Sequence, residues 1–154
     1  MKKYFILSFV FLSFGLFGQE INWLTLEQAE VEMKKSPNKL LFIDFYTDWC
    51  GWCKKMDTST FKEPEVIKYI NEHYIPVKFD AESKEEVKFR GKTYKFLKPQ
   101  NGGYRGVNSF AYFSLRGKLS YPAYAVMTNK GKLDRLLLGY MSKERLFQGL
   151  EQTK

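Results

Sequence analysis

The sequence is poor in the residues that cross-link small proteins or bind metals. Among its 154 residues there are two cysteines and one histidine, and both cysteines lie in one short motif. A disulfide-stapled mini-protein is therefore excluded, because such proteins need several spaced cysteines. A structural zinc site needs about four ligands. Two cysteines and His73, twenty residues after the second, do not form a typical one.

The chain also lacks internal repeats, low-complexity tracts and any apolar run of the roughly 20 residues that a membrane-spanning helix requires. It is 44% hydrophobic and 18% aromatic, with a formal net charge of +8. This mixed composition excludes intrinsic disorder, collagen-like structure and a multi-span membrane protein. The length fits one domain with a substantial core.

The N-terminal segment 1–18 has the layout of a secretory signal peptide. Met1-Lys2-Lys3 is positively charged, and the run Tyr4–Phe17 is apolar apart from two serines and one glycine. Cleavage could follow Gly18 or fall three residues earlier, and an uncleaved N-terminal anchor is the alternative. We therefore predict a domain over 19–154 that is secreted across the inner membrane into the periplasm, where thiols can be oxidised.

Hydrophobic periodicity and turn residues predict an α/β order of elements. The strand over 39–46 is an almost continuous apolar run, typical of a central strand covered on both faces. Trp23, Phe45 and Trp49 are predicted core aromatics. The full order predicts a mixed central sheet flanked by helices. The elements are a helix from Thr25 to before Pro37, the strand over 39–46, a helix from Lys54 to about Thr58, a helix starting at Pro64, a strand over 74–79, a hairpin over 87–96, a loop over 100–103, a helix capped by Asn108 or Ser109, strands over 123–127 and 133–138, and a helix capped by Ser142.

Two cysteines three positions apart follow the central strand, in Trp49-Cys-Gly-Trp-Cys53. At a strand-to-helix junction the first sulfur lies among unpaired helix N–H groups, at the positive end of the helix dipole. Such a site stabilises a thiolate, which is the nucleophile of disulfide exchange. Cys50 and Cys53 are therefore candidate redox residues, with a purely structural disulfide as the alternative. Covalent haem attachment is excluded, because Lys54 stands where that motif needs histidine.

The residues around this motif resemble the thioredoxin superfamily. Phe42-Ile-Asp-Phe-Tyr-Thr-Asp-Trp-Cys-Gly-Trp-Cys-Lys54 matches the family's strand and motif, and Tyr121-Pro122 matches its cis-proline element. The turn over 129–132 and the last helix match its C-terminal half. Within the superfamily the chain most resembles secreted bacterial thiol–disulfide interchange proteins. The resemblance implies a thioredoxin fold.

The resemblance covers about 21–80 and 107–152, which leaves an insertion at about 82–106. From Lys84 to Lys118 there are nine Lys or Arg residues and two Glu. This basic stretch is either a solvated surface or a rim that steers acidic partners. Nucleic-acid binding is not expected, because the chain carries no recognition motif and is predicted to act outside the cytoplasm.

The resemblance assigns three catalytic residues. Cys50 would be the attacking thiol, Cys53 the resolving thiol, and Asp44 the buried acid that takes the proton from Cys53. Independently, burial in an apolar strand is expected to raise the pKa of Asp44, although the side chain could instead face solvent at the strand end. Lys78 either pairs with this acid or is an ordinary surface lysine.

The resemblance also implies a substrate site formed by Trp49, Gly51, Trp52, Tyr121 and Pro122. The residue before the cis-proline offers its backbone to an extended substrate segment, which adds as a strand. Two departures put substrate preference in question. Gly-Trp replaces the more familiar Gly-Pro between the cysteines, and Tyr121 replaces the usual Thr or Ile. Trp52 either contacts substrate or packs against the protein.

The sequence thus predicts a thioredoxin-like thiol–disulfide oxidoreductase, with a reductase preferred over an oxidase or isomerase. A thioredoxin-fold binding module without catalysis is the alternative from another class. The redox pair belongs to the protein itself, so neither a bound cofactor nor a metal is expected. The expected partners are protein thiols or disulfides and a membrane-bound thiol electron donor.

Overall fold

The computed structural model describes residues 20–99 and 105–151. The predicted signal peptide and the predicted loop over 100–103 lie outside the described residues. The helices are α1 (Leu26–Lys35), α2 (Gly51–Thr58), the 3-10 turn η1 (Thr60–Lys62), α3 (Pro64–His73), α4 (Ser109–Ser114) and α5 (Lys143–Glu151). The strands are β1 (Leu40–Tyr46), β2 (Tyr74–Asp80), β3 (Val87–Phe89), β4 (Lys92–Tyr94), β5 (Phe96–Leu97), β6 (Val107–Asn108), β7 (Ala123–Met127) and β8 (Leu133–Leu138).

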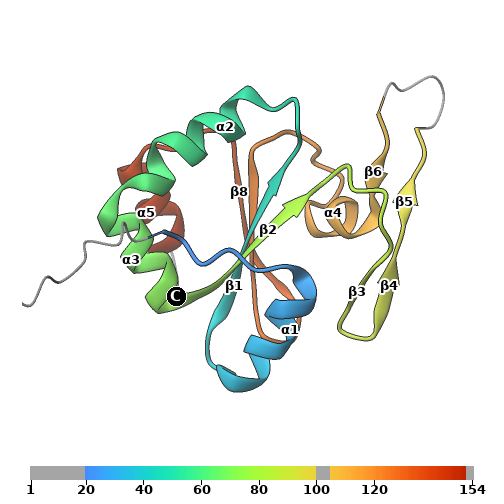
Figure 1. Cartoon of the computed structure of the whole chain (residues 1–154), viewed down its shortest axis with the longest axis horizontal. Coiled ribbons are helices and arrows are strands. Elements are labelled where there is room, and N and C mark those ends of the chain that lie inside the picture. Colours follow the sequence, from blue (N-terminus) through green and yellow to red (C-terminus); the bar gives the residue numbers. More distant parts are fainter. Residues whose placement is uncertain (1–19, 100–104, 152–154) are drawn as a thin grey trace, which may run out of the picture.

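A four-stranded sheet in the order β2-β1-β7-β8 forms the centre of the molecule (Figure 1). β1 pairs in parallel with β2 and antiparallel with β7, and β7 pairs antiparallel with β8. Leu24, just before α1, adds a parallel bridge to Val77 at the outer edge of β2. The predicted mixed sheet is therefore confirmed. Within the described residues, none of the helices has the length and apolarity to cross a membrane.

The side chains of β1 divide the core into two parts. Leu41, Ile43 and Phe45 pack with residues of α1 and α4, whereas Phe42 packs with residues of α2, α3 and α5. Since successive side chains of a strand point to opposite faces, Asp44 shares the face of Phe42. Its carboxyl group therefore lies on the side of the sheet that α2 covers.

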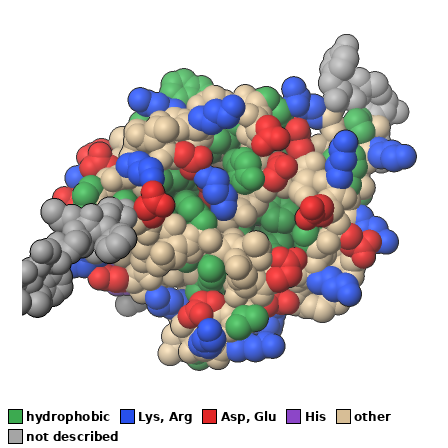
Figure 2. All heavy atoms as spheres, in the orientation of Figure 1, with side chains coloured by type: hydrophobic (Ala, Val, Ile, Leu, Met, Phe, Trp, Pro, Cys, Tyr) green, Lys and Arg blue, Asp and Glu red, His purple; other side chains and the backbone are tan. Residues whose placement is uncertain are grey.

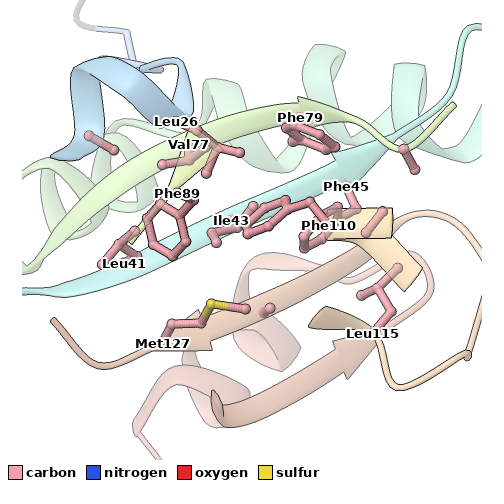
Figure 3. Close-up of a cluster of buried hydrophobic side chains, with 14 of the residues drawn as sticks. Leu26, Leu41, Ile43, Phe45, Val77, Phe79, Phe89, Phe110, Leu115 and Met127 are labelled. Atoms are coloured by element: carbon pink, nitrogen blue, oxygen red, sulfur yellow. The ribbon is translucent and has the colours of Figure 1, made fainter. Parts of the chain in front are cut away.

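Between β2 and α4 the chain leaves the sheet and forms the predicted insertion. The hairpin of β3 and β4 turns at Arg90 and Gly91, both with positive φ. β5 pairs with β6, a pairing that the sequence did not predict. In Figure 1 these short strands stand beside α4, at the opposite end of the molecule from α3 and α5. Figure 3 shows Phe89 of β3 and Phe110 of α4 pointing toward the side chains of β1.

Candidate active site

The two cysteines lie at the start of α2 and form a disulfide. Cys50 is the N-cap of the helix, and its Sγ accepts a hydrogen bond from the backbone N–H of Cys53 at 3.0 Å. The helix begins at Gly51 rather than at Lys54, so the motif itself forms its first turn. The predicted position of the first sulfur at a helix N-terminus is confirmed. Because the first turn of α2 contains no acidic residue, nothing there opposes a negative charge on this sulfur.

Asp44 is buried on β1, with 2% of its surface exposed. Its Oδ2 lies 3.5 Å from the Nζ of Lys78, which occupies the paired position on β2. Burial raises the pKa of Asp44 to about 7, against the opposing effect of the Lys78 charge. The alternative of a solvent-facing Asp44 is wrong, and the pairing with Lys78 is confirmed. The carboxyl group can therefore gain or lose a proton near neutral pH.

Asp57 is a site residue that the sequence analysis missed. Its carboxylate accepts a short hydrogen bond from the same Lys78 ammonium group that faces Asp44. The Asp57 side chain is 39% exposed, so Lys78 connects a buried carboxyl with one that reaches solvent. Asp57 follows Cys53 by four positions on α2, a spacing that places two side chains on one helix face. That spacing was the signal that could have identified it.

The peptide bond between Tyr121 and Pro122 is cis, as the resemblance implied. Two indoles near the cysteines are exposed, Trp49 by 50% and Trp52 by 61%. The Trp52 ring lies 5.4 Å from that of Tyr140, and the Trp49 ring lies 6.2 Å from that of Tyr121. The structure thus places the half-exposed Trp49 against Tyr121, which precedes the buried Pro122, while Trp52 and Gly51 are exposed on α2.

The predicted core position of Trp49 is wrong, because this residue follows the end of β1, where the sheet no longer covers it. Phe45 is fully buried as predicted, and Trp23 is partly buried beside Phe42. Trp49 instead contacts two residues at the ends of the insertion. Its Nε1 donates to Glu82 at 3.0 Å, and the Cζ of Arg105 lies 4.7 Å from its ring centroid.

Neither Glu82 nor Arg105 was predicted as a site residue, because the insertion falls outside the resemblance and the contact joins residues far apart in sequence. No cluster of three or more potential metal ligands occurs in the part of the chain that the structure describes. His73 ends α3, where its ring lies 4.6 Å from that of Tyr69.

A family model described as "Protein of unknown function, DUF255" (Thioredox_DsbH) matches residues 16–111. The thiol:disulfide interchange protein DsbD of Neisseria meningitidis is 24% identical over 126 residues. These residues are 81% of this chain and 17% of that protein, so the chain spans less than a fifth of the relative's length.

Two solved structures show the same fold. The reduced C-terminal domain of Neisseria meningitidis DsbD is 24% identical with a TM-score of 0.55, covering 84% of this chain and 94% of that one. A thioredoxin from Thermus thermophilus is 12% identical with a TM-score of 0.60, covering 86% of each chain. Because the family model matches more than half of the sequence and the fold agrees, the chain belongs to the thioredoxin-like DUF255 (Thioredox_DsbH) family.

Proposed function

We propose that this protein is a thiol–disulfide oxidoreductase that reduces disulfides in other proteins through Cys50 and Cys53. The observation that carries the proposal is the position of the Cys50 sulfur at the N-terminus of α2, where the Cys53 N–H donates to it. A sulfur so placed is stabilised as a thiolate once the disulfide is reduced. The pair supplies the electrons, and no bound cofactor or metal is required.

The reaction proceeds by two thiol–disulfide exchanges. The Cys50 thiolate attacks one sulfur of the substrate disulfide, which forms a mixed disulfide and releases the other substrate sulfur as a thiolate. Cys53 then attacks the Cys50 sulfur, which releases the second substrate sulfur and forms the Cys50–Cys53 disulfide. Two electrons have passed to the substrate, and a reduced donor must restore the pair.

Asp44 acts in the second exchange as the acceptor of the Cys53 proton. Its pKa of about 7 allows it to be ionised before the step and protonated after it. The Lys78 ammonium group contacts both Asp44 and the partly exposed Asp57, and it stabilises the ionised form of Asp44 that accepts the proton. This arrangement supports acid–base assistance to the resolving thiol rather than to the attacking one, whose sulfur is already stabilised by α2.

Substrate binds beside the cis-proline, where an extended segment adds to the backbone at Tyr121. The exposed indoles of Trp49 and Trp52 offer apolar contact area to that segment. The N-terminal layout supports export, so we place the activity in the periplasm, with a membrane-bound thiol protein as electron donor. The name of the related interchange protein supports the reaction class.

Two cysteine variants test the reaction. With dithiothreitol as donor and a disulfide-bonded protein as substrate, Cys50→Ser is expected to lose at least ~1000-fold in rate, because the nucleophile is absent. The reduced Cys53→Ser variant, mixed with the same substrate in the absence of dithiothreitol, should perform the first attack and accumulate the mixed disulfide, which mass spectrometry detects. If the wild type is no faster than Cys50→Ser, the protein is a binding module and the proposal is wrong.

The direction of electron flow is tested by equilibrating the pair with glutathione. A reduction potential near that of thioredoxin, about −270 mV, supports a reductase, whereas one near about −120 mV identifies an oxidase. The equilibrium is read from the fraction of the chain that alkylating reagent labels at both cysteines.

Replacing Asp44 with asparagine tests its role. Asp44→Asn should slow release of the mixed disulfide by about 100-fold at pH 7 while leaving the attack by Cys50 nearly unchanged. The pH profile of release should also lose its inflection near pH 7. Asp48→Asn is the matched control, because it removes an exposed carboxylate beside the motif. Equal slowing of both steps in Asp44→Asn would reject the assignment.

A further inference from the structure

The two ends of the insertion meet on the indole of Trp49. Glu82, at its start, accepts the indole N–H at 3.0 Å, and Arg105, at its end, places its guanidinium group over the ring with Cζ 4.7 Å from the centroid. Nη1 of Arg105 lies 3.5 Å from Oε2 of Glu82. The Glu82 carboxylate therefore contacts both the indole N–H of Trp49 and the Arg105 guanidinium group that lies over the indole ring.

Local structure determines the position of Arg105. At the next residue, Gly106, a Cβ atom would overlap the Phe96 ring and the Leu97 carbonyl, so only glycine permits the close pairing of β5 and β6. β6 then enters the core with Val107 and Asn108, which are 9% and 0% exposed. Arg105 thus lies three residues before Asn108, which anchors this segment in the core.

The same anchor holds the segment that carries Glu82. The Asn108 N–H donates to the Ala81 carbonyl at 2.7 Å, and its Nδ2 donates to the carbonyls of Ser83 and Glu85 at 3.2 and 3.0 Å. Glu82 lies between two of these acceptors. A buried side chain therefore connects the two ends of the insertion directly behind the residues that contact Trp49.

We propose that Arg105 is a positioning residue, through which the insertion holds the Trp49 indole against Tyr121 as a fixed wall of the proposed substrate site. The Trp49 and Tyr121 rings meet edge to face at 6.2 Å, and Tyr121 precedes the cis-proline. The inference rests on the proposed function, because it assumes that a protein substrate lies along this wall. Trp49 is half-exposed, so without Arg105 and Glu82 its ring would be free to rotate.

The consequence is a division between substrates. An extended protein segment that covers the Trp49 indole binds more tightly when the indole is already ordered, because ordering a side chain on binding costs free energy. A small disulfide reagent that reaches only the Cys50 sulfur does not touch the indole, so its reaction does not depend on that order. Arg105 should thus affect the KM for a protein disulfide, while the chemistry of the cysteine pair and its potential stay unchanged.

The test compares Arg105→Ala with the wild type on a disulfide-bonded protein and on a small aromatic disulfide. Arg105→Ala should raise the KM for the protein about 3- to 10-fold, as expected for loss of one cation–aromatic contact, and change kcat less than twofold. The rate with the small disulfide and the reduction potential should not change. Lys88→Ala is the matched control, because it removes one positive charge from an exposed position of the same insertion.

Two further variants separate stacking from charge. Arg105→Lys keeps the charge but loses the planar group, so it should restore the KM only in part. Arg105→Glu should be at least as impaired as Arg105→Ala. If Lys88→Ala raises the KM as much as Arg105→Ala does, the effect is one of general charge and the proposal is wrong. An unchanged KM in Arg105→Ala overturns it equally.

A spectroscopic readout tests the contact without turnover. The Trp49 indole N–H signal, assigned from its loss in Trp49→Phe, should exchange with solvent at least several-fold faster in Arg105→Ala than in the wild type. Equal exchange in the two proteins would refute the holding role. A wild type that shows this ordered indole but reduces no protein disulfide would instead refute the proposed function.

Discussion

The central sheet and the insertion position their side chains in different ways. In the sheet, the regular pairing of β1 with β2 and β7 places Asp44 opposite Lys78 and beneath α2. In the insertion, strands of two or three residues depend on individual side chains, such as Ser109, whose Oγ accepts from the Lys95 N–H at 2.9 Å. The sheet therefore builds the reactive centre, and the insertion builds part of its surroundings.

The two regions also differ in where their charges lie. Asp44 is buried in the sheet, whereas Figure 2 shows Lys and Arg side chains on the outer surface along the end of the molecule that carries the insertion, with acidic groups among them. One such pair joins Lys95 to Glu86 at 2.9 Å with both side chains more than half exposed. Exposed pairs of this kind contribute about 0–1 kcal/mol. Ion pairs of this kind in the insertion therefore add little to the stability of the fold.

The regions nevertheless share one core, and its centre is Phe110 of α4. Its ring lies 5.8 Å from Phe45 and 5.0 Å from Phe79 in the sheet, and 5.4 Å from Phe89 and 5.2 Å from Tyr94 in the hairpin. Figure 3 shows this meeting of side chains from separate elements. Removing the ring should thus reveal whether the two regions unfold as one.

Phe110→Ala is expected to lower the free energy of unfolding by about 3–5 kcal/mol, because it removes a fully buried aromatic ring and leaves a cavity. Urea denaturation followed by tryptophan fluorescence and by far-UV circular dichroism measures this loss. The two transitions should stay coincident, since one core spans both regions.

Phe113→Ala is the matched control on the same helix. Phe113 is 66% exposed, so its loss should change stability by less than about 0.5 kcal/mol. Separate unfolding transitions for fluorescence and circular dichroism in the wild type would contradict the shared core. They would show that the insertion unfolds independently of the sheet.

Asp44→Asn should stabilise the protein at high pH. The folded-state pKa of Asp44 is raised from 3.8 to about 7. Between these values the folded protein holds a proton that the unfolded chain has lost, so stability falls as pH rises through this window. At pH 8 the variant should thus be about 2–4 kcal/mol more stable than the wild type, at about 1.4 kcal/mol per pKa unit.

The difference should shrink to below about 1 kcal/mol at pH 4, because Asp44 is then protonated in the folded protein and close to half protonated in the unfolded chain. Urea midpoints of the oxidised proteins at pH 4, 6 and 8 measure it. A difference independent of pH would show that Asp44 does not titrate in this window. It would also remove the basis for its role as a proton acceptor.

The sequence predicted the sheet region well because its signals are local. The apolar run of β1, the helix start at Thr25 and the proline that begins α3 each act within a few residues, and all three are confirmed. The position of Cys50 followed from a strand-to-helix junction. Asp44 was identified because a carboxylic acid inside an apolar strand is anomalous.

The sequence did not predict the contacts of the insertion, because they join residues distant in the chain. Strands as short as β5 and β6 carry too few residues for a period to be recognised. Trp49 was predicted in the core on hydrophobicity alone, yet its partners Glu82 and Arg105 lie on the surface, 33 and 56 positions later. Only the folded chain shows that Gly106 and Asn108 bring these two residues together.

Asn108 offers the smallest test of how the insertion is attached. Asn108→Ala should lower the free energy of unfolding by about 2 kcal/mol, because it loses the cap of α4 and two part-buried hydrogen bonds to the carbonyls of Ser83 and Glu85. Asn108→Ser keeps a capping hydroxyl but cannot bridge to Ser83 and Glu85, so it should recover about half of this loss.

If the bridge positions Glu82, both variants should also increase hydrogen exchange of the Trp49 indole, whereas Phe113→Ala should not. Protection equal to that of the wild type in Asn108→Ala would mean that β5–β6 pairing alone holds the ends of the insertion, and that the Asn108 side chain contributes to stability without ordering the Trp49 indole.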